Sequence, residues 1–229
     1  MALYAIGDLH LSLGTDKPMD IFGGRWINHT EKIKNGFQIL GPEDVCVLCG
    51  DISWAMNLEE SIEDFKFIDS LPGKKLILKG NHDYWWNTAA KMKAFFEAAC
   101  IKTIDILHNN SFRYGDAAIC GTRGWLADDA FSAAQNKKIM DRENLRLRAS
   151  LQAAGDAREK LCFFHYPPRF KNTVCYDIIS AMDEHDVKTC IYGHLHGEGH
   201  RLAVRGIVDG IDYEIVSADF VGFVPQKIV

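Results

Sequence analysis

The sequence lacks any long run of apolar residues. Its longest uninterrupted apolar stretches, such as residues 45–49, hold only a few residues, well short of the roughly 20 that a membrane-spanning helix needs. The first nine residues also lack a basic segment followed by an apolar one, which a secretory leader carries. We therefore expect no transmembrane helix and a cytoplasmic location.

A disulfide framework and a basic excess are also missing. The seven cysteines are odd in number and scattered along the chain, which is typical of reduced, buried thiols. Cys46 and Cys49 form a CxxC pair, but no second pair follows at zinc-ribbon spacing, so we expect both in the core. The formal net charge of -5 argues against broad electrostatic binding to nucleic acid, although it leaves room for a local basic rim.

No internal repeat, low-complexity stretch or linker divides the 229 residues. With 47% hydrophobic and 25% charged residues, the chain has the proportions of a soluble globular protein with a sizeable core. We expect one domain over residues 1–229. The longest irregular segment covers residues 11–30, and loops of this length are usually functional or mobile.

Short apolar runs alternate with helical patterns, and this alternation predicts an α/β fold. Predicted strands cover residues 3–7, 45–50, 75–80, 117–121, 160–164 and 188–193. Predicted helices cover residues 31–40, 58–70, 88–99, 128–154 and 172–185, and the fourth begins with the cap candidates Asp128 and Asp129. Near the end, residues 205–208 and 211–216 flank Asp209-Gly210, a dipeptide preferred in two-residue hairpin turns. The sheet structure is therefore expected to be mixed.

Strand after strand ends in a polar cluster. The clusters are Gly7-Asp8-Leu9-His10, Gly50-Asp51, Gly80-Asn81-His82-Asp83, Phe164-His165-Tyr166 and Gly193-His194-Leu195-His196. Ligands of open α/β sheets bind at the carboxyl ends of the strands, so these clusters can converge although they are far apart in sequence. A glycine before a ligand residue lets the backbone turn tightly and approach an ion closely.

The residue types in these clusters are those of a metal site. In Asp8-x-His10 and His194-x-His196, alternate side chains of an extended chain lie on the same side, so each pair can share an ion. Carboxylates, one amide and imidazoles without a thiolate suit manganese, iron or zinc, with magnesium as a further candidate. Two such ions need bridging anions, for which Asp51 and a water activated toward a pKa of about 7 are the candidates.

The order GDLH, GD, GNHD, an isolated His and GHLH, between residues 7 and 196, resembles the five-motif signature of calcineurin-like metallophosphoesterases. The resemblance implies an α/β fold, a four-layer α/β/β/α sandwich with two mixed β-sheets. It implies one metal held by Asp8, His10, Asp51 and His196, and a second held by Asp51, Asn81, His165 and His194. It also implies that His82 approaches the leaving-group oxygen as a general acid or charge stabiliser.

Trp54 departs from the family pattern, because phosphoprotein phosphatases of the family place an acidic partner for this histidine there. Asp83 is a candidate substitute, so we include it with His82 as a candidate catalytic residue, although neighbouring side chains in an extended segment point apart. Arg25 and Arg123 are candidate substrate-binding residues, because a planar guanidinium suits a phosphate oxygen. A solvated or salt-bridged arginine is the alternative for each.

The predicted function is a metal-dependent phosphoesterase that hydrolyses a small phosphomonoester or phosphodiester by attack of a metal-bridging hydroxide at phosphorus. A nuclease acting on DNA or RNA is one alternative, which the acidic balance disfavours. A catalytically silent scaffold or binding module is another, although every expected ligand position is filled. Three aromatic residues follow GNHD directly: Tyr84, Trp85 and Trp86. They can stack on a leaving group or anchor the next helix in the core, and the second interpretation is favoured.

Overall fold

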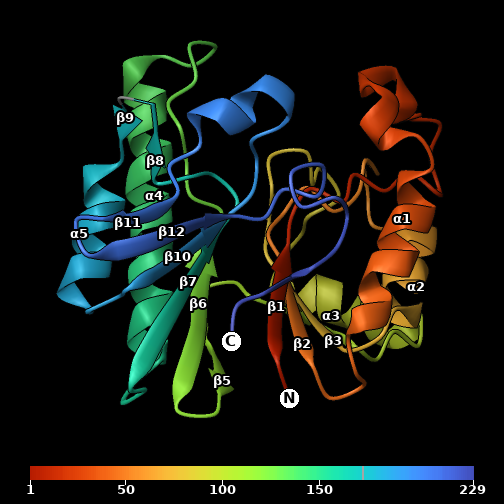
Figure 1. Ribbon diagram of the computed structural model, residues 1–229, viewed down its shortest axis with the longest axis horizontal. Helices are drawn as coiled ribbons and strands as arrows, with labels where there is room; N and C mark the ends of the chain where they lie inside the picture. The colour runs from red at the N-terminus through yellow and green to blue at the C-terminus, as the bar shows by residue number, and fades with distance from the viewer. Residues whose placement is uncertain (172) are drawn as a thin grey trace. The chain divides into compact units, whose positions relative to one another are not determined.

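The computed structural model describes residues 1–171 and 173–229. The chain divides into two compact units. Unit 1 consists of Met1–Ile106 and Val216–Val229, and unit 2 consists of Leu107–Ile215. Each unit has its own large β-sheet (Figure 1). The single domain expected over residues 1–229 stays a prediction.

The sheet of unit 1 has five strands in the order β13-β1-β2-β3-β4. They are β1 (Leu3–Ile6), β2 (Val45–Leu48), β3 (Lys74–Ile77), β4 (Ile104–Ile106) and β13 (Gln226–Lys227). Strands β1 to β4 are parallel, and β13 pairs antiparallel with β1. Strand β2 lies at the centre of this sheet, and its sequence Val-Cys-Val-Leu is a continuous apolar run. Such runs are typical of parallel strands that are covered on both faces.

The helices of unit 1 are α1 (His29–Gly36), α2 (Ile62–Ser70) and α3 (Ala89–Ala98), with short 3₁₀ turns η1 (Asp20–Phe22), η2 (Gly24–Trp26) and η3 (Phe37–Ile39). Helices α1 and α2 lie on the same face of the sheet (Figure 1). Thr88 caps α3 by accepting a hydrogen bond from the backbone of Lys91. Helix α2 begins later than predicted because residues 58–61 form turns.

The sheet of unit 2 has six strands in the order β11-β12-β10-β7-β6-β5. They are β5 (Phe112–Tyr114), β6 (Ala117–Thr122), β7 (Glu159–Phe164), β10 (Thr189–Tyr192), β11 (Gly206–Val208) and β12 (Ile211–Ile215). The four inner strands are parallel, and the two edge strands are antiparallel. Asp209 and Gly210 both have positive φ, so the predicted hairpin is confirmed. Strands β8 (Arg169–Phe170) and β9 (Thr173–Val174) form a separate pair, and a 3₁₀ segment, η4 (Gly197–Leu202), follows β10.

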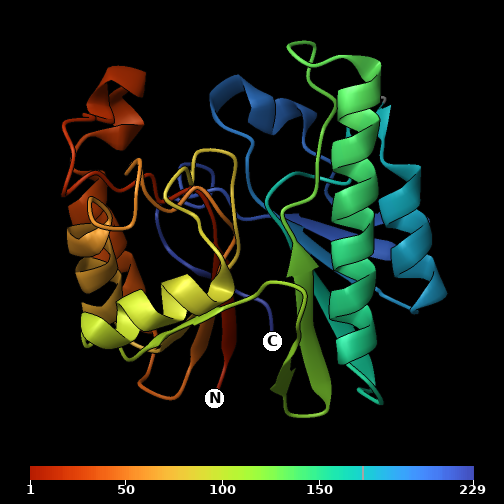
Figure 2. The same cartoon turned by 180° about the vertical axis from the view of Figure 1, so that it is seen from behind.

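Helices α4 (Ala133–Ala153) and α5 (Tyr176–Glu184) pack against each other, and α4 runs along β6 (Figure 2). The prediction that the long helix starts at Asp128 was wrong. Ser132 caps α4 instead, in a reciprocal capping box with Gln135, while the Asp128 carboxylate accepts a hydrogen bond from Ala130 in the preceding turn. The last helix, predicted over residues 172–185, begins only at Tyr176, because Thr173–Val174 pair with β8 as strand β9. Residue 172 itself lies outside the described residues.

The predicted α/β class with two mixed sheets is confirmed. Across the two described stretches of chain, no helix has the length and apolar character needed to cross a membrane. All seven cysteines are free. Cys46 and Cys49 are buried as expected, whereas Cys100 is exposed.

Candidate functional site

In unit 1, two neighbouring parallel strands deliver polar residues to the same sheet edge. Asp8 and His10 follow β1, Asp51 follows β2, and all three side chains are buried. The backbone N–H of Asp8 donates to the carbonyl of Gly50 at 2.8 Å, and that of His10 donates to the carbonyl of Asp51 at 2.9 Å. The two strand-end segments are therefore fixed against each other, at the edge where α/β sheets bind ligands.

Four of the predicted metal ligands have left-handed backbone conformations. The φ angles are 60° at Asp8, 47° at His10, 50° at Asp51 and, in unit 2, 71° at His194. Such values are uncommon in residues other than glycine, and they cluster at functional sites where the surrounding structure enforces them. These backbone conformations orient the four ligand side chains, and they cost some conformational free energy at each position.

The unit 1 side chains are close enough to share ions. The Nε2 atom of His10 lies 3.7 Å from Oδ2 of Asp51. A carboxylate oxygen of Asp8 lies within 4.8 Å of a ring nitrogen of His10 and within 4.8 Å of a carboxylate oxygen of Asp51. Two buried carboxylates at this separation repel each other unless positive charge is shared between them. The donor set of unit 1 therefore fits a divalent cation.

The GNHD loop follows β3 and is packed onto Asp51. A Cβ atom on Gly80 would collide with the backbone nitrogen and Oδ1 of Asp51, so glycine is required there. The backbone N–H of His82 donates to Oδ1 of Asp51 at 2.7 Å. Asn81, between them, is half-buried. The candidate ligands after β2 and β3 therefore form one connected assembly.

The Asp83 carboxylate is buried and accepts five N–H hydrogen bonds. Its Oδ2 accepts from Gly80 at 2.7 Å and from Asp51 at 3.0 Å. Its Oδ1 accepts from the backbone of Ile52 and Ser53 and from the indole of Trp85. Burial raises the pKa of Asp83 to about 6, while these donors act to lower it. Through these hydrogen bonds, Asp83 holds the loops after β2 and β3 together. Its predicted assistance to His82 stays a prediction.

The ring of Trp54 contacts two histidines of unit 1. Its centroid lies 4.4 Å from the ring of His82 and 5.0 Å from the ring of His10, on which it stacks. The ammonium of Lys17 lies 5.0 Å from the Trp54 centroid. The sequence marked Trp54 only as a departure from the family pattern. Its position three residues after Asp51 was the one signal that it belongs to the site.

The segment of residues 11–30 also reaches the surroundings of His10. His29 is buried and forms hydrogen bonds with the backbone of His10 and of Trp26, and burial lowers its pKa. The ring of Trp26 lies 5.7 Å from that of His10, edge to face. No role in orienting His10 was predicted for either residue, because nothing in their spacing relates them to the first motif.

In unit 2, three histidines follow two neighbouring parallel strands. His165 follows β7 and is buried, whereas His194 and His196 follow β10 and are half-buried. The Nδ1 atom of His194 lies 3.2 Å from Nε2 of His165, and the ring of Tyr166 lies 4.2 Å from that of His194. A ring nitrogen of His196 lies within 4.8 Å of one of His200. Paired imidazole nitrogens at such distances suit a divalent metal.

The two candidate substrate-binding arginines differ in environment. Arg25 is exposed on η2 and donates to the carbonyl of Asp219 at 3.3 Å. Arg123 is largely buried, its Nη2 lies 3.6 Å from Glu143 Oε1, and burial lowers its pKa. The backbone carbonyl of Arg123 also accepts hydrogen bonds from His165 and Tyr166. Arg123 is thus salt-bridged and anchored beside a predicted ligand, and the substrate-binding roles of both arginines stay predictions.

The strand-end clusters and their donor types define the class of protein. The chain belongs to the calcineurin-like phosphoesterase family, whose sequence profile matches residues 1–198. The resemblance drawn from the motifs is thereby confirmed, and members of this family depend on divalent metal ions.

The solved structures that resemble this chain are distant from it in sequence. The phosphopantetheinyl hydrolase PptH from Mycobacterium tuberculosis is 15% identical, with a TM-score of 0.60 over 100% of this chain and 95% of its own. Protein AQ665 of unknown function from Aquifex aeolicus is also 15% identical, with a TM-score of 0.49 over 99% of this chain and 95% of its own. None of the curated proteins compared with the chain matches it. At this identity, the likeness to the hydrolase supports the shared fold alone.

Proposed function

We propose that this chain is a metal-dependent phosphoesterase that hydrolyses a small phosphorylated substrate with the help of two divalent ions. Membership of the calcineurin-like phosphoesterase family supports phosphoester hydrolysis and the use of metal. The observation that carries the proposal is the placement of Asp51. It lies at the carboxyl end of the central strand β2, buried beside Asp8 and His10.

Seven side chains are the proposed metal ligands: Asp8, His10, Asp51 and Asn81 from unit 1, and His165, His194 and His196 from unit 2. Asp51 is the proposed shared ligand, because a carboxylate has two oxygens. Bound divalent ions supply positive charge for the phosphoryl oxygens and lower the pKa of a coordinated water toward about 7. The absence of thiolates from the set favours manganese, iron or zinc.

His82 is the proposed proton donor to the leaving-group oxygen. Its backbone is tied to Asp51 at 2.7 Å, so its place relative to the ligand loop is fixed. Contact with the Trp54 ring at 4.4 Å restricts the orientation of its imidazole. A positioned imidazole is the commonest general acid in enzymes.

Arg25 and Arg123 are proposed to contact substrate phosphate oxygens. The buried Nε of Arg123 has no hydrogen-bond partner among residues 1–171 and 173–229. A guanidinium that keeps one N–H unsatisfied, although its Nη2 lies close to Glu143, retains a donor for an anionic oxygen.

Metal analysis combined with hydrolysis of an aryl phosphate monoester and diester tests this function. With manganese present, the wild type should bind metal and hydrolyse at least one ester. Asp51→Asn should lose most activity and bind less metal, because the shared carboxylate is discharged. His82→Ala should lower turnover while metal content stays near that of the wild type, and His185→Ala, at the end of α5, is the matched control.

Each contrary result has a distinct meaning. Equal loss of metal from Asp51→Asn and His82→Ala would show that His82 is misassigned. Metal binding without hydrolysis of either ester would favour a silent scaffold. Hydrolysis of DNA or RNA in strong preference to both small esters would favour a nuclease.

A further inference from the structure

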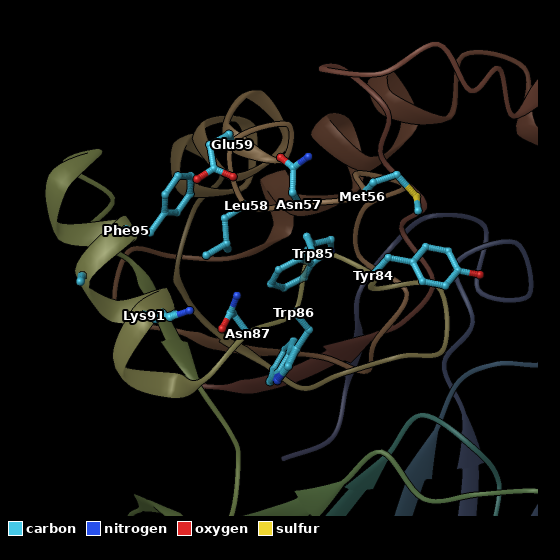
Figure 3. Close-up of a pocket in the computed structure, with 11 residues that line it drawn as sticks. Met56, Asn57, Leu58, Glu59, Tyr84, Trp85, Trp86, Asn87, Lys91 and Phe95 are labelled. Atoms are coloured by element: carbon cyan, nitrogen blue, oxygen red, sulfur yellow. The ribbon is translucent and has the colours of Figure 1, made fainter.

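A cavity of about 480 Å³ lies within unit 1, next to the GNHD loop (Figure 3). Its wall comes from residues 56–59, from residues 84–87 and from α3. This volume is within the range of roughly 300–1,000 Å³ that is usual for small-molecule sites. Nothing in the proposed hydrolytic chemistry requires this cavity.

The cavity and the surroundings of His82 share one residue, Tyr84. The ring of Tyr84 lies 6.1 Å from the ring of His82, edge to face. The indole of Trp85, which forms part of the wall, donates to Oδ1 of Asp83 at 3.1 Å. A leaving group held beside His82 would therefore also lie close to Tyr84 in the cavity wall.

Four of the eleven lining residues are aromatic, and they are not equally buried. Trp85 belongs to the core and packs edge to face on Phe65 at 4.8 Å. Tyr84 is 53% exposed and Met56 is 59% exposed, although both are large apolar side chains. In Figure 3 these two lie beside each other at one side of the cavity. Packing thus accounts for Trp85 and leaves Tyr84 and Met56 unexplained.

The rim supplies hydrogen-bond donors. Lys91 lines the cavity from α3 and, within the described parts of the chain, has no ion-pair partner. The Asn87 side-chain oxygen is occupied by the backbone N–H of Thr88 at 2.9 Å. The side-chain NH₂ group of Asn87 can therefore still donate a hydrogen bond to a ligand. The lining therefore combines hydrogen-bond donors with aromatic side chains, a combination suited to a flat ring that carries acceptor atoms.

We propose that this cavity is the subsite for the leaving group of the phosphoester. It takes an aromatic ring with hydrogen-bond acceptors, of the kind that a nucleobase provides. The substrate class is then a small aromatic phosphate ester, and the inference rests on the proposed function. Tyr84 and Trp86 stack on the ring, while Asn87 and Lys91 donate to its acceptor atoms.

The first test needs neither metal nor turnover. Adenosine is titrated into the protein in EDTA, and tryptophan fluorescence is followed because Trp85 and Trp86 line the cavity. Saturable quenching by adenosine but not by ribose is expected. Tyr84→Ala should weaken binding by about tenfold, as is usual for loss of one stacked ring. Tyr176→Ala removes a tyrosine that is 76% exposed on α5 and should leave binding unchanged.

The second test uses the manganese-loaded protein. Adenosine 5′-phosphate and glycerol phosphate are compared as monoesters and as methyl diesters. The wild type should prefer the adenosine ester in kcat/KM, and Tyr84→Ala should reduce this preference by about tenfold, mainly through KM. Tyr176→Ala should retain the wild-type preference.

The outcomes separate this inference from the proposed function. Hydrolysis without preference for the adenosine ester, together with no adenosine binding in EDTA, would overturn the subsite and leave the phosphoesterase proposal standing. Adenosine binding that depends on Tyr84, without hydrolysis of any ester, would support the subsite and overturn the proposed function. Binding or preference that is equal in wild type and Tyr84→Ala would overturn the subsite.

Discussion

Asp83→Asn is the substitution whose effect the structure defines most fully. The change is nearly isosteric, so it creates no cavity. It replaces one carboxylate oxygen with an NH₂ group, which cannot accept a hydrogen bond. The Oδ2 atom of Asp83 accepts from two backbone N–H groups, and Oδ1 accepts from three donors. Whichever of these two positions the NH₂ group takes, at least two donors lose their acceptor.

The size of the effect follows from counting those donors. Each buried polar group left unsatisfied costs about 1–3 kcal/mol, so two donors predict a loss of about 2–6 kcal/mol in the free energy of unfolding. This is a large part of the roughly 5–15 kcal/mol that keeps a domain folded. Because the Asp51 backbone is one of the freed groups, metal affinity should fall as well.

Urea unfolding of the metal-free protein, followed by tryptophan fluorescence, measures this loss. Asp105→Asn is the matched control, since Asp105 is exposed on β4 in the same unit, and it should change stability by less than about 0.5 kcal/mol. A loss below about 1 kcal/mol for Asp83→Asn would refute the reasoning, because the five N–H groups would then not depend on the carboxylate.

Three further substitutions test other parts of unit 1. Trp54→Leu should broaden the His82 ring signals in NMR spectra and lower kcat more than it raises KM. Trp54→Phe, which keeps an aromatic ring, should restore the sharp signals and kcat. Equal line widths and equal kcat in the two variants would exclude a role for the ring. Burial lowers the pKa of Lys75 to about 8. The unfolded chain then binds more protons between about pH 8 and 10.4, so stability should rise with pH there. Lys75→Met should reduce that slope, and an unchanged slope would contradict the assignment. Gly80→Ala should abolish metal binding because its Cβ meets Asp51, whereas Gly24→Ala, which meets nothing within 4 Å, should not; metal content measures both.

The central strands could be predicted from the sequence because their signals are local. Strand β2 is a continuous apolar run, and β7 ends in one, residues 161–164. A glycine or a polar residue follows each run closely. In the two large sheets, the strands β4, β5 and β13 were missed, and all three lie at sheet edges and hold only two or three residues. The two-residue strands β8 and β9 were missed as well. A segment that short shows no period, so its pairing depends on the neighbouring strand. The start of α4 was misplaced because Asp128 and Ser132 are both good caps, and only the reciprocal contact with Gln135 decides between them.

The candidate ligands were likewise predicted from short motifs, whereas their surroundings were not. The contact of Trp54 with His10 and His82 joins three separate segments of unit 1. The bond between His29 and the backbone of His10 depends on how residues 11–30 fold. The donors that surround Asp83 come from the two loops after β2 and β3 and include backbone groups, which no residue pattern reveals.

Anomalous scattering from crystals grown with manganese is the most direct test of the metal centre. Two peaks are expected, both within coordination distance of Asp51, one of them also bound by Asp8 and His10. A map with no peak within coordination distance of Asp51, in crystals that contain manganese elsewhere, would contradict the proposed function.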